Sequence, residues 1–152
     1  GWMYLINAFG KHKKFKNYFL HHEQSCTMAA DVYARVKKKP AVVCVTTGPG
    51  GINAINGVFG AYTDSVPMIV ISGQVKTQTN MVIKKKTGLR QLGDQENDII
   101  QMVKKITKKS ILIRNQRFLV KNFKKLVTLS WSGRPGPIWI DIPINIQGEK
   151  IK

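Results

Sequence analysis

The chain has 152 residues, a length typical of a single domain, and its 43% apolar content is enough to bury a core and argues against disorder. None of its apolar runs reaches the roughly 18 residues that would cross a membrane, so we expect no membrane partner. The net charge of +17 suggests nucleic-acid binding, but twenty of the 25 cations are lysines, and arginine is the better residue for bidentate contacts with phosphates and bases. We therefore expect a lysine-rich solvated surface and no specific nucleic-acid partner.

Apolar, β-branched runs alternate with segments of helical period along the first half of the chain. Five elements are predicted there: a helix at residues 3–9, a strand at 17–21, a helix at 23–36, a buried strand at 41–47, and a helix at 52–62. The run "GPGG" at residues 48–51 separates the buried strand from the helix that follows it.

The second half continues the same alternation. Its predicted elements are a strand at residues 67–73, a long loop at 74–93, a helix at 96–104, a strand at 110–113, a helix at 116–130, and a final strand at 138–143 with a polar tail. Strands that alternate with helices predict an α/β fold, a three-layer open parallel sheet with helices on both faces.

In such sheets a ligand lies outside the carboxyl ends of the strands, where the loops that follow the strands converge. Three segments follow predicted strands directly: residues 21–23 ("HHE"), 47–51 ("TGPGG") and 73–74 ("GQ"). A fourth, residues 93–96 ("GDQE"), ends the long loop and could fold over the same edge. We expect these four segments to meet at one edge of the sheet.

The glycine-rich turn has two interpretations when it is read alone. Its backbone amides could face an anion or a flat ring, but the Lys-Ser/Thr of a phosphate-binding loop is missing, and Asn53 stands where a third glycine would be. Read in isolation, the glycines favour a tight turn with a purely structural role. Glu23, likewise, could only complement the dipole of the helix that it begins.

Other reactive groups carry less information. The run "GDQEND" at residues 93–98 lacks the glycine and the cluster of oxygen ligands of a metal-binding turn, so no metal ligands are predicted. Cys26 and Cys44 have no zinc-site spacing and are expected to be buried thiols in a reducing compartment. Since Gly1 opens no signal-like segment, we expect a cytoplasmic protein.

Three stretches together resemble one family: "HHEQSCTMAADVYARV" at residues 21–36, "VVCVTTGPGGINAINGVFGAYTDSVPMIVISGQV" at 42–75, and "GRPGPIWIDIP" at 133–143. They are similar to the N-terminal, pyrimidine-binding domain of thiamine-diphosphate-dependent enzymes, and within these to the acetolactate synthase (acetohydroxyacid synthase) large subunit. The resemblance implies such a domain at residues 1–147, N-terminally truncated and without its first strand, and the start of a linker at residues 148–152.

The resemblance also implies roles for individual residues. Glu23 matches the glutamate that hydrogen-bonds N1′ of the cofactor's aminopyrimidine and favours its imino tautomer, whose nitrogen removes the proton from C2 of the thiazolium. Gly48, Pro49 and Gly50 match the turn beside the pyrimidine, and Asn53 matches the position just after it.

Gln95 matches a glutamine that reaches the reaction site in acetolactate synthases. Gly93 and Asp94 precede it where those synthases commonly have an alanine and a phenylalanine, which leaves the substrate pair open. The small-residue helix at residues 52–62 lies where the family pairs two subunits across the cofactor.

The function that the resemblance implies is thiamine diphosphate binding within an enzyme that decarboxylates a 2-oxo acid and transfers the carbanion to a second carbonyl, as in branched-chain amino acid biosynthesis. Magnesium would be held by a domain absent from this chain, FAD could be needed by the full-length enzyme, and this fragment alone should be inactive. The expected partners are the 2-oxo acid and a second subunit, in a homodimer or tetramer, or a separate diphosphate-binding domain. Three alternatives stay open: a different thiamine-diphosphate-dependent decarboxylase or ligase, a non-catalytic remnant or partner-binding module, and a basic nucleic-acid-binding protein.

Overall fold

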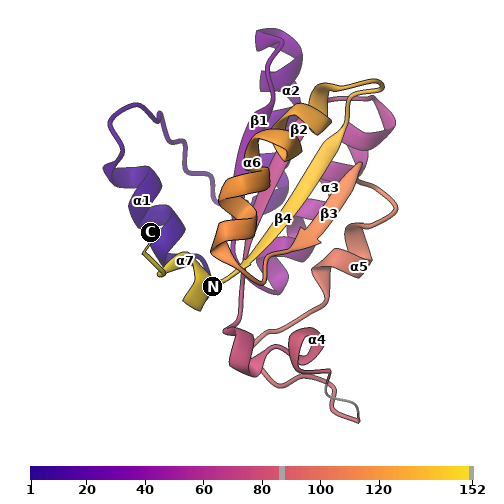
Figure 1. The fold of residues 1–152 in the computed structure, drawn as a ribbon. Helices are drawn as coiled ribbons and strands as arrows, with labels where there is room; N and C mark the ends of the chain where they lie inside the picture. The colour runs from indigo at the N-terminus through magenta and orange to yellow at the C-terminus, as the bar shows by residue number, and fades with distance from the viewer. Residues whose placement is uncertain (86–87, 151–152) are drawn as a thin grey trace.

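The computed structural model describes residues 1–85 and 88–150. Their centre is a sheet of four parallel strands in the order β1-β2-β4-β3 (Figure 1). The strands are β1 (Ala41–Val45), β2 (Met68–Gln74), β3 (Lys109–Leu112) and β4 (Pro137–Pro143). Because all the strands run in one direction, their carboxyl ends meet at one edge.

Helices cover both faces of this sheet, so the predicted three-layer architecture is confirmed (Figure 1). The helices are α1 (Met3–Lys11), α2 (Glu23–Lys37), α3 (Pro49–Thr63), the 3-10 turn η1 (Thr77–Thr79), α4 (Met81–Lys84), α5 (Ile99–Val103), α6 (Gln116–Trp131) and α7 (Ile144–Gln147). One apolar cluster joins the sheet to α2, α3 and α5, and the other joins it to α1, α6 and α7. Within residues 1–85 and 88–150, no helix has the length and apolar character needed to span a bilayer.

The two central strands explain why the sheet reads as continuous apolar runs. Every residue of β2 and β4 is buried, because helices lie above and below them. Alternate side chains enter opposite layers: Val70 and Trp139 pack toward α2 and α3, while Ile71 and Ile140 pack toward α6.

The predicted strand at residues 17–21 is wrong. This segment forms no strand, and Tyr18, Phe19 and Leu20 expose 71%, 72% and 46% of their surface. An apolar run becomes a strand only when a neighbour supplies its hydrogen-bond ladder, and in the described part of the chain β1 is an edge strand that pairs with β2 alone.

Other elements also differ from the prediction, in their limits or in their presence. Helix α3 begins at Pro49 because proline suits the first turn of a helix, where its missing N–H is not needed. Helix α5 begins only at Ile99, since Asp98 caps it by accepting a hydrogen bond from Gln101 N. Helix α7 stands where only a polar tail was expected. The expected linker at 148–152 ends in residues 151–152, which lie outside the described residues.

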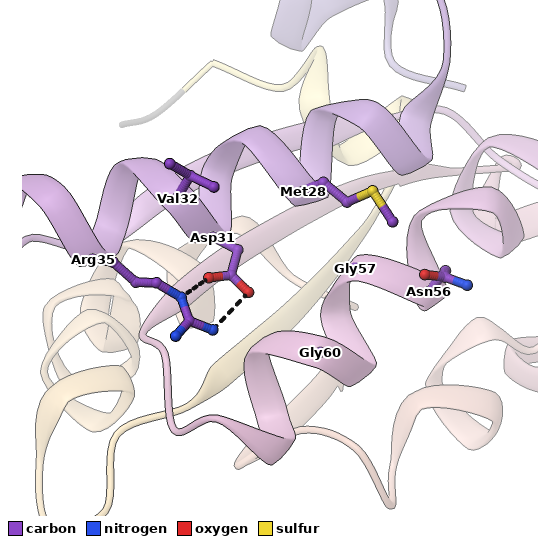
Figure 2. A pocket seen from close by; sticks show the side chains of 7 residues that line it. All are labelled: Met28, Asp31, Val32, Arg35, Asn56, Gly57 and Gly60. Carbon is purple, nitrogen blue, oxygen red and sulfur yellow. Dashed lines mark hydrogen bonds and ion pairs between the residues drawn. The ribbon is translucent and has the colours of Figure 1, made fainter.

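Helices α2 and α3 approach each other closely at a glycine. A Cβ atom on Gly57 would lie 2.7 Å from Thr27 Cβ and 3.0 Å from Met28 N, which leaves no room for a side chain. Figure 2 shows Gly57 and Gly60 on α3 beside α2, where Arg35 binds Asp31. The small-residue face predicted for α3 therefore packs against α2 of the same chain, at Gly57.

We predict that Gly57→Ala lowers the free energy of unfolding by roughly 1–3 kcal/mol, because the new methyl group must displace Thr27 and the α2 backbone. Gly60→Ala is the matched control on the same helix: its Cβ would meet only Asp31 Oδ2, at 4.0 Å, so the gain in helix propensity should raise stability by roughly 0.5–1 kcal/mol. Denaturant unfolding of both variants measures the difference, and equal stabilities would contradict the close helix approach.

Candidate functional site

The four segments predicted to meet at the carboxyl edge do lie together. Thr47 Oγ1, just after β1, donates a hydrogen bond to the carbonyl oxygen of Gly73 at the end of β2 (2.9 Å). Gln74 reaches across to the carbonyl oxygen of Asn97 (3.1 Å). The edge therefore joins the ends of two strands to the segment that precedes α5.

Glu23 enters this edge as the first residue of α2. His22 caps the helix: its Nδ1 accepts a hydrogen bond from Gln24 N (3.2 Å), which accounts for one histidine as a structural residue. Asn53, in the first turns of α3, donates from Nδ2 to Glu23 Oε2 (3.1 Å). The carboxylate is half-buried, and Oε1 accepts no hydrogen bond from the described residues.

The glycine-rich turn forms the wall next to this carboxylate. Gly48 has a φ of +64°, in the left-handed region that favours glycine, and its carbonyl accepts the hydrogen bond that starts α3, from Ile52 N (3.0 Å). A Cβ on Gly50 would lie 3.2 Å from Glu23 Oε1 and 2.7 Å from Thr46 Cγ2. A side chain at Gly50 would therefore clash with Thr46, and the bare glycine backbone packs closely against Oε1 of Glu23.

Gln95 approaches the same turn from the other side. A Cβ on Gly48 would lie 2.5 Å from Gln95 O and 3.0 Å from Gln95 Cβ, so the two backbones are in close contact. Gln95 is exposed and has a φ of 54°, which is uncommon for a residue with a side chain. The structure brings Gln95 to the Gly48 turn, and Asp94 next to it is also exposed.

Glu96 orders the long segment before α5, a role that sequence reasoning missed. Its carboxylate accepts hydrogen bonds from Leu92 N (3.2 Å), Gly93 N (3.0 Å) and Met81 N. These bonds tie the end of the segment to its middle. The chain order gave no indication of this, because the three donors are backbone groups spread over residues 81–93.

A buried carboxylate lies behind the edge. Asp141 in β4 accepts hydrogen bonds from Ser72 Oγ (2.6 Å) and Gln74 Nε2 (2.9 Å), and Trp139 Nε1 donates to Ser72 Oγ (2.7 Å). Burial raises the pKa of Asp141 to about 7, the nearby Asp98 adds to this effect, and the two hydrogen bonds oppose it. The sequence does carry a sign of this residue, an acid inside the apolar run "IWIDIP".

The remaining reactive groups offer no second centre of chemistry. Both cysteines are free; burial raises the pKa of Cys44 to about 12 and also raises the pKa of Cys26, so both thiols are protonated at neutral pH. The described ranges contain no group of three or more His, Cys, Asp or Glu side chains that could hold a metal ion.

An open groove of about 330 Å³ lies between α2 and α3, further along both helices than Glu23 (Figure 2). Its lining is mostly apolar or small, with one ion pair: Met28, Asp31, Val32, Arg35, Asn56, Gly57 and Gly60. Arg35 also binds Asp64 at the end of α3 (2.6 Å), so the groove is closed at that end by charged groups that tie the two helices together.

Comparison with known proteins places the chain in a family. Residues 2–102 match the family described as "Thiamine pyrophosphate enzyme, N-terminal TPP binding domain". The chain is 43% identical over 127 residues to the acetolactate synthase large subunit of Buchnera aphidicola from Acyrthosiphon pisum, and 37% identical over 127 residues to the acetolactate synthase isozyme 3 large subunit of Escherichia coli K12; each match covers 84% of this chain and 21% of the relative. The chloroplastic acetolactate synthase of Arabidopsis thaliana is 32% identical over 148 residues, 95% of this chain and 20% of the relative. The chain thus spans about a fifth of the length of these relatives.

We predict that Asp141→Asn removes a pH dependence from the stability of the fold. Folding raises the pKa of Asp141 from 3.8 to about 7, so between these pH values the folded form keeps a proton that the unfolded form loses. The free energy of unfolding should therefore be highest below about pH 4, fall as the pH rises to about 7, and then level off. Between pH 4 and pH 8 the wild type should lose roughly 2–4 kcal/mol relative to the variant.

Denaturant unfolding at several pH values measures this loss. Asp94→Asn, which changes an exposed carboxylate, is the matched control and should follow the wild type. Parallel pH profiles for wild type and Asp141→Asn would contradict the prediction, because they would show that burial does not raise the pKa of Asp141.

Proposed function

Because the chain belongs to the family of the thiamine pyrophosphate enzyme N-terminal TPP binding domain, we propose that it supplies the aminopyrimidine half of a thiamine diphosphate site in an acetolactate-synthase-like enzyme. That enzyme would decarboxylate a 2-oxo acid such as pyruvate and join the resulting carbanion to a second carbonyl. The observation that carries the proposal is the free Oε1 of Glu23, held at the sheet edge beside the Gly48 turn.

The residues at this edge fit a flat heteroaromatic ring. Asn53 holds one oxygen of the Glu23 carboxylate and leaves the other free to bind a ring nitrogen. Gly50 lets α3 pack closely at this carboxylate, since even a methyl group there would lie 3.2 Å from Oε1. A carboxylate with one fixed oxygen and one oxygen free of hydrogen bonds is suited to a ligand that exchanges a proton at a nitrogen.

In the proposed reaction the residues of this chain bind, orient and move a proton, and the bound cofactor supplies the carbanion chemistry. Glu23 would share a proton between Oε1 and N1′ of the aminopyrimidine. Asn53 would keep the carboxylate in the plane that this exchange needs, and Gly48 and Pro49 would line the ring. Gln95, carried to the Gly48 turn, would contact the 2-oxo acid.

The other parts of the site would come from outside these residues. The diphosphate and its magnesium ion need oxygen ligands that the described residues do not cluster, so we assign them to a separate domain of the complete enzyme or of a partner chain. FAD, where it is needed, would bind mostly to a further, middle domain that also lies outside these residues. The domain assigned to residues 1–147 is part of the same proposal, with residues 148–152 leading out of it.

Pairing with a second subunit would involve α2 and α3. Their outer surface exposes a row of large apolar side chains beside the groove: Met28, Val32, Val36, Ile52 and Phe59. Exposed apolar area of this kind is typical of a subunit interface. A complete enzyme that sediments as a monomer at micromolar concentration would contradict this part of the proposal.

We predict that Glu23→Gln, made in the complete enzyme, lowers kcat for acetolactate formation by about 10²–10³-fold, because an amide cannot exchange a proton with the ring. Folding and the bond from Asn53 should survive, since the amide oxygen still accepts it. Steady-state kinetics with pyruvate, thiamine diphosphate and magnesium measure the change.

Glu149→Gln, an equal charge change at an exposed residue, is the control and should keep wild-type rates. Full activity of Glu23→Gln would refute the role of the glutamate. A complete chain that binds no thiamine diphosphate would favour the non-catalytic alternative, in which the fold serves only to bind a partner.

A further inference from the structure

The side-chain amide of Gln74 is held in one orientation. Its Oε1 accepts a hydrogen bond from Val75 N (2.9 Å), and its two Nε2 hydrogens go to Asp141 Oδ2 (2.9 Å) and to the carbonyl oxygen of Asn97 (3.1 Å). A flipped amide would place its oxygen against both of those acceptors and its nitrogen against the Val75 N–H. With 2% of its surface exposed, Gln74 has no water to replace these partners.

Asp141 is the anchor that makes this orientation rigid. It is 1% exposed and is bound from its other side by Ser72, which is bound in turn by Trp139. A hydrogen-bonded chain therefore runs from the sheet core, through Asp141 and Gln74, to the backbone of Asn97. Buried polar chains of this kind fix geometry because a member that moves leaves a buried partner without that hydrogen bond.

Segment 93–97, to which Gln74 is hydrogen-bonded at Asn97, contains Gln95. At one end of the segment, a Cβ on Gly93 would lie 2.8 Å from Val75 Cβ, so Gly93 is pressed against the residue after Gln74. At the other end, Asn97 is bound by Gln74 itself. Gln95 lies between these two attachments, with its carbonyl against Gly48 and a φ of 54°.

That backbone conformation requires support from outside the segment. A left-handed φ is unfavourable for a residue with a Cβ, and the exposed Gln95 side chain gains no burial in return. The bond from Gln74 to Asn97 is a support that originates in the sheet core, whereas the Glu96 bonds join the segment to Leu92, Gly93 and the start of α4 at Met81, all outside the sheet.

We propose that Gln74, held by Asp141, is a positioning residue that fixes segment 93–97 and thereby places Gln95 against the Gly48 turn. This inference rests on the proposed function only where it treats Gln95 as a residue of the reaction site. Gln74 itself touches neither the ring nor the 2-oxo acid in this account; it acts through the backbone of Asn97.

The test is hydrogen exchange of backbone amides in the intact chain with Gln74→Met, which keeps the length of the side chain and removes its donors. We expect the amides of Leu92, Gly93 and Glu96, which hydrogen-bond within the segment, to exchange at least tenfold faster, with the β2 and β4 amides unchanged. Gln78→Met, an exposed residue in η1, is the matched control and should leave all rates unchanged. Asp141→Asn should also keep the segment slow, because its amide oxygen still accepts from Gln74.

Unchanged exchange of the Leu92, Gly93 and Glu96 amides, or a uniform acceleration over the whole sheet, would overturn the positioning role. If Gln74→Met does not fold, Gln74→Asn replaces it, because the shorter side-chain amide cannot reach both Asp141 and Asn97. The same two outcomes would then overturn the positioning role.

In the complete enzyme, Gln74→Met should lower kcat at least fivefold and change thiamine diphosphate affinity less than twofold. The exchange measurement needs no cofactor, so its failure contradicts the positioning role alone, whereas an enzyme that binds no thiamine diphosphate contradicts the proposed function alone.

Discussion

The site depends first on the close backbone contact between Gly48 and Gln95. Gly48 has a positive φ and has no room for a Cβ, because Gln95 O would lie 2.5 Å from it. This turn ends β1 and starts α3 at Pro49, so it also sets the direction in which Asn53 meets Glu23. One tight turn therefore places the Glu23 carboxylate and the Gln95 backbone at the same edge of the sheet.

A second constraint comes from a polar group placed inside an apolar sheet. Burying Asp141 is unfavourable, as its pKa of about 7 indicates, and an apolar residue would pack in β4 without that penalty. What the carboxylate provides is a fixed acceptor for Ser72 and Gln74 at the end of two central strands. The fold thus carries an unfavourable group at the point where its strands meet the site, as functional regions commonly do.

Much of the architecture follows from sequence pattern because periodicity reports burial. The continuous apolar runs in β1, β2 and β4 and the helical period of α2 were sufficient to predict the layers. The strand expected at residues 17–21 was wrong because its pattern is apolar but its ladder partner is not among the described strands. Pairing is a long-range property that no local pattern contains.

The candidate site divides in the same way. The sheet rule brought Glu23 and the Gly48 turn to one edge, and the match to the thiamine pyrophosphate enzyme family covers both. Gln74, by contrast, acts through a hydrogen bond to the carbonyl of Asn97, twenty-three positions away, and no local sequence pattern predicts such a bond.

The most direct test of the proposed function is a crystal structure of the complete enzyme with thiamine diphosphate bound. We predict that Glu23 Oε1 lies about 2.6–3.2 Å from N1′ of the aminopyrimidine. A ring bound away from the Gly48 turn, with Glu23 facing solvent, would contradict it.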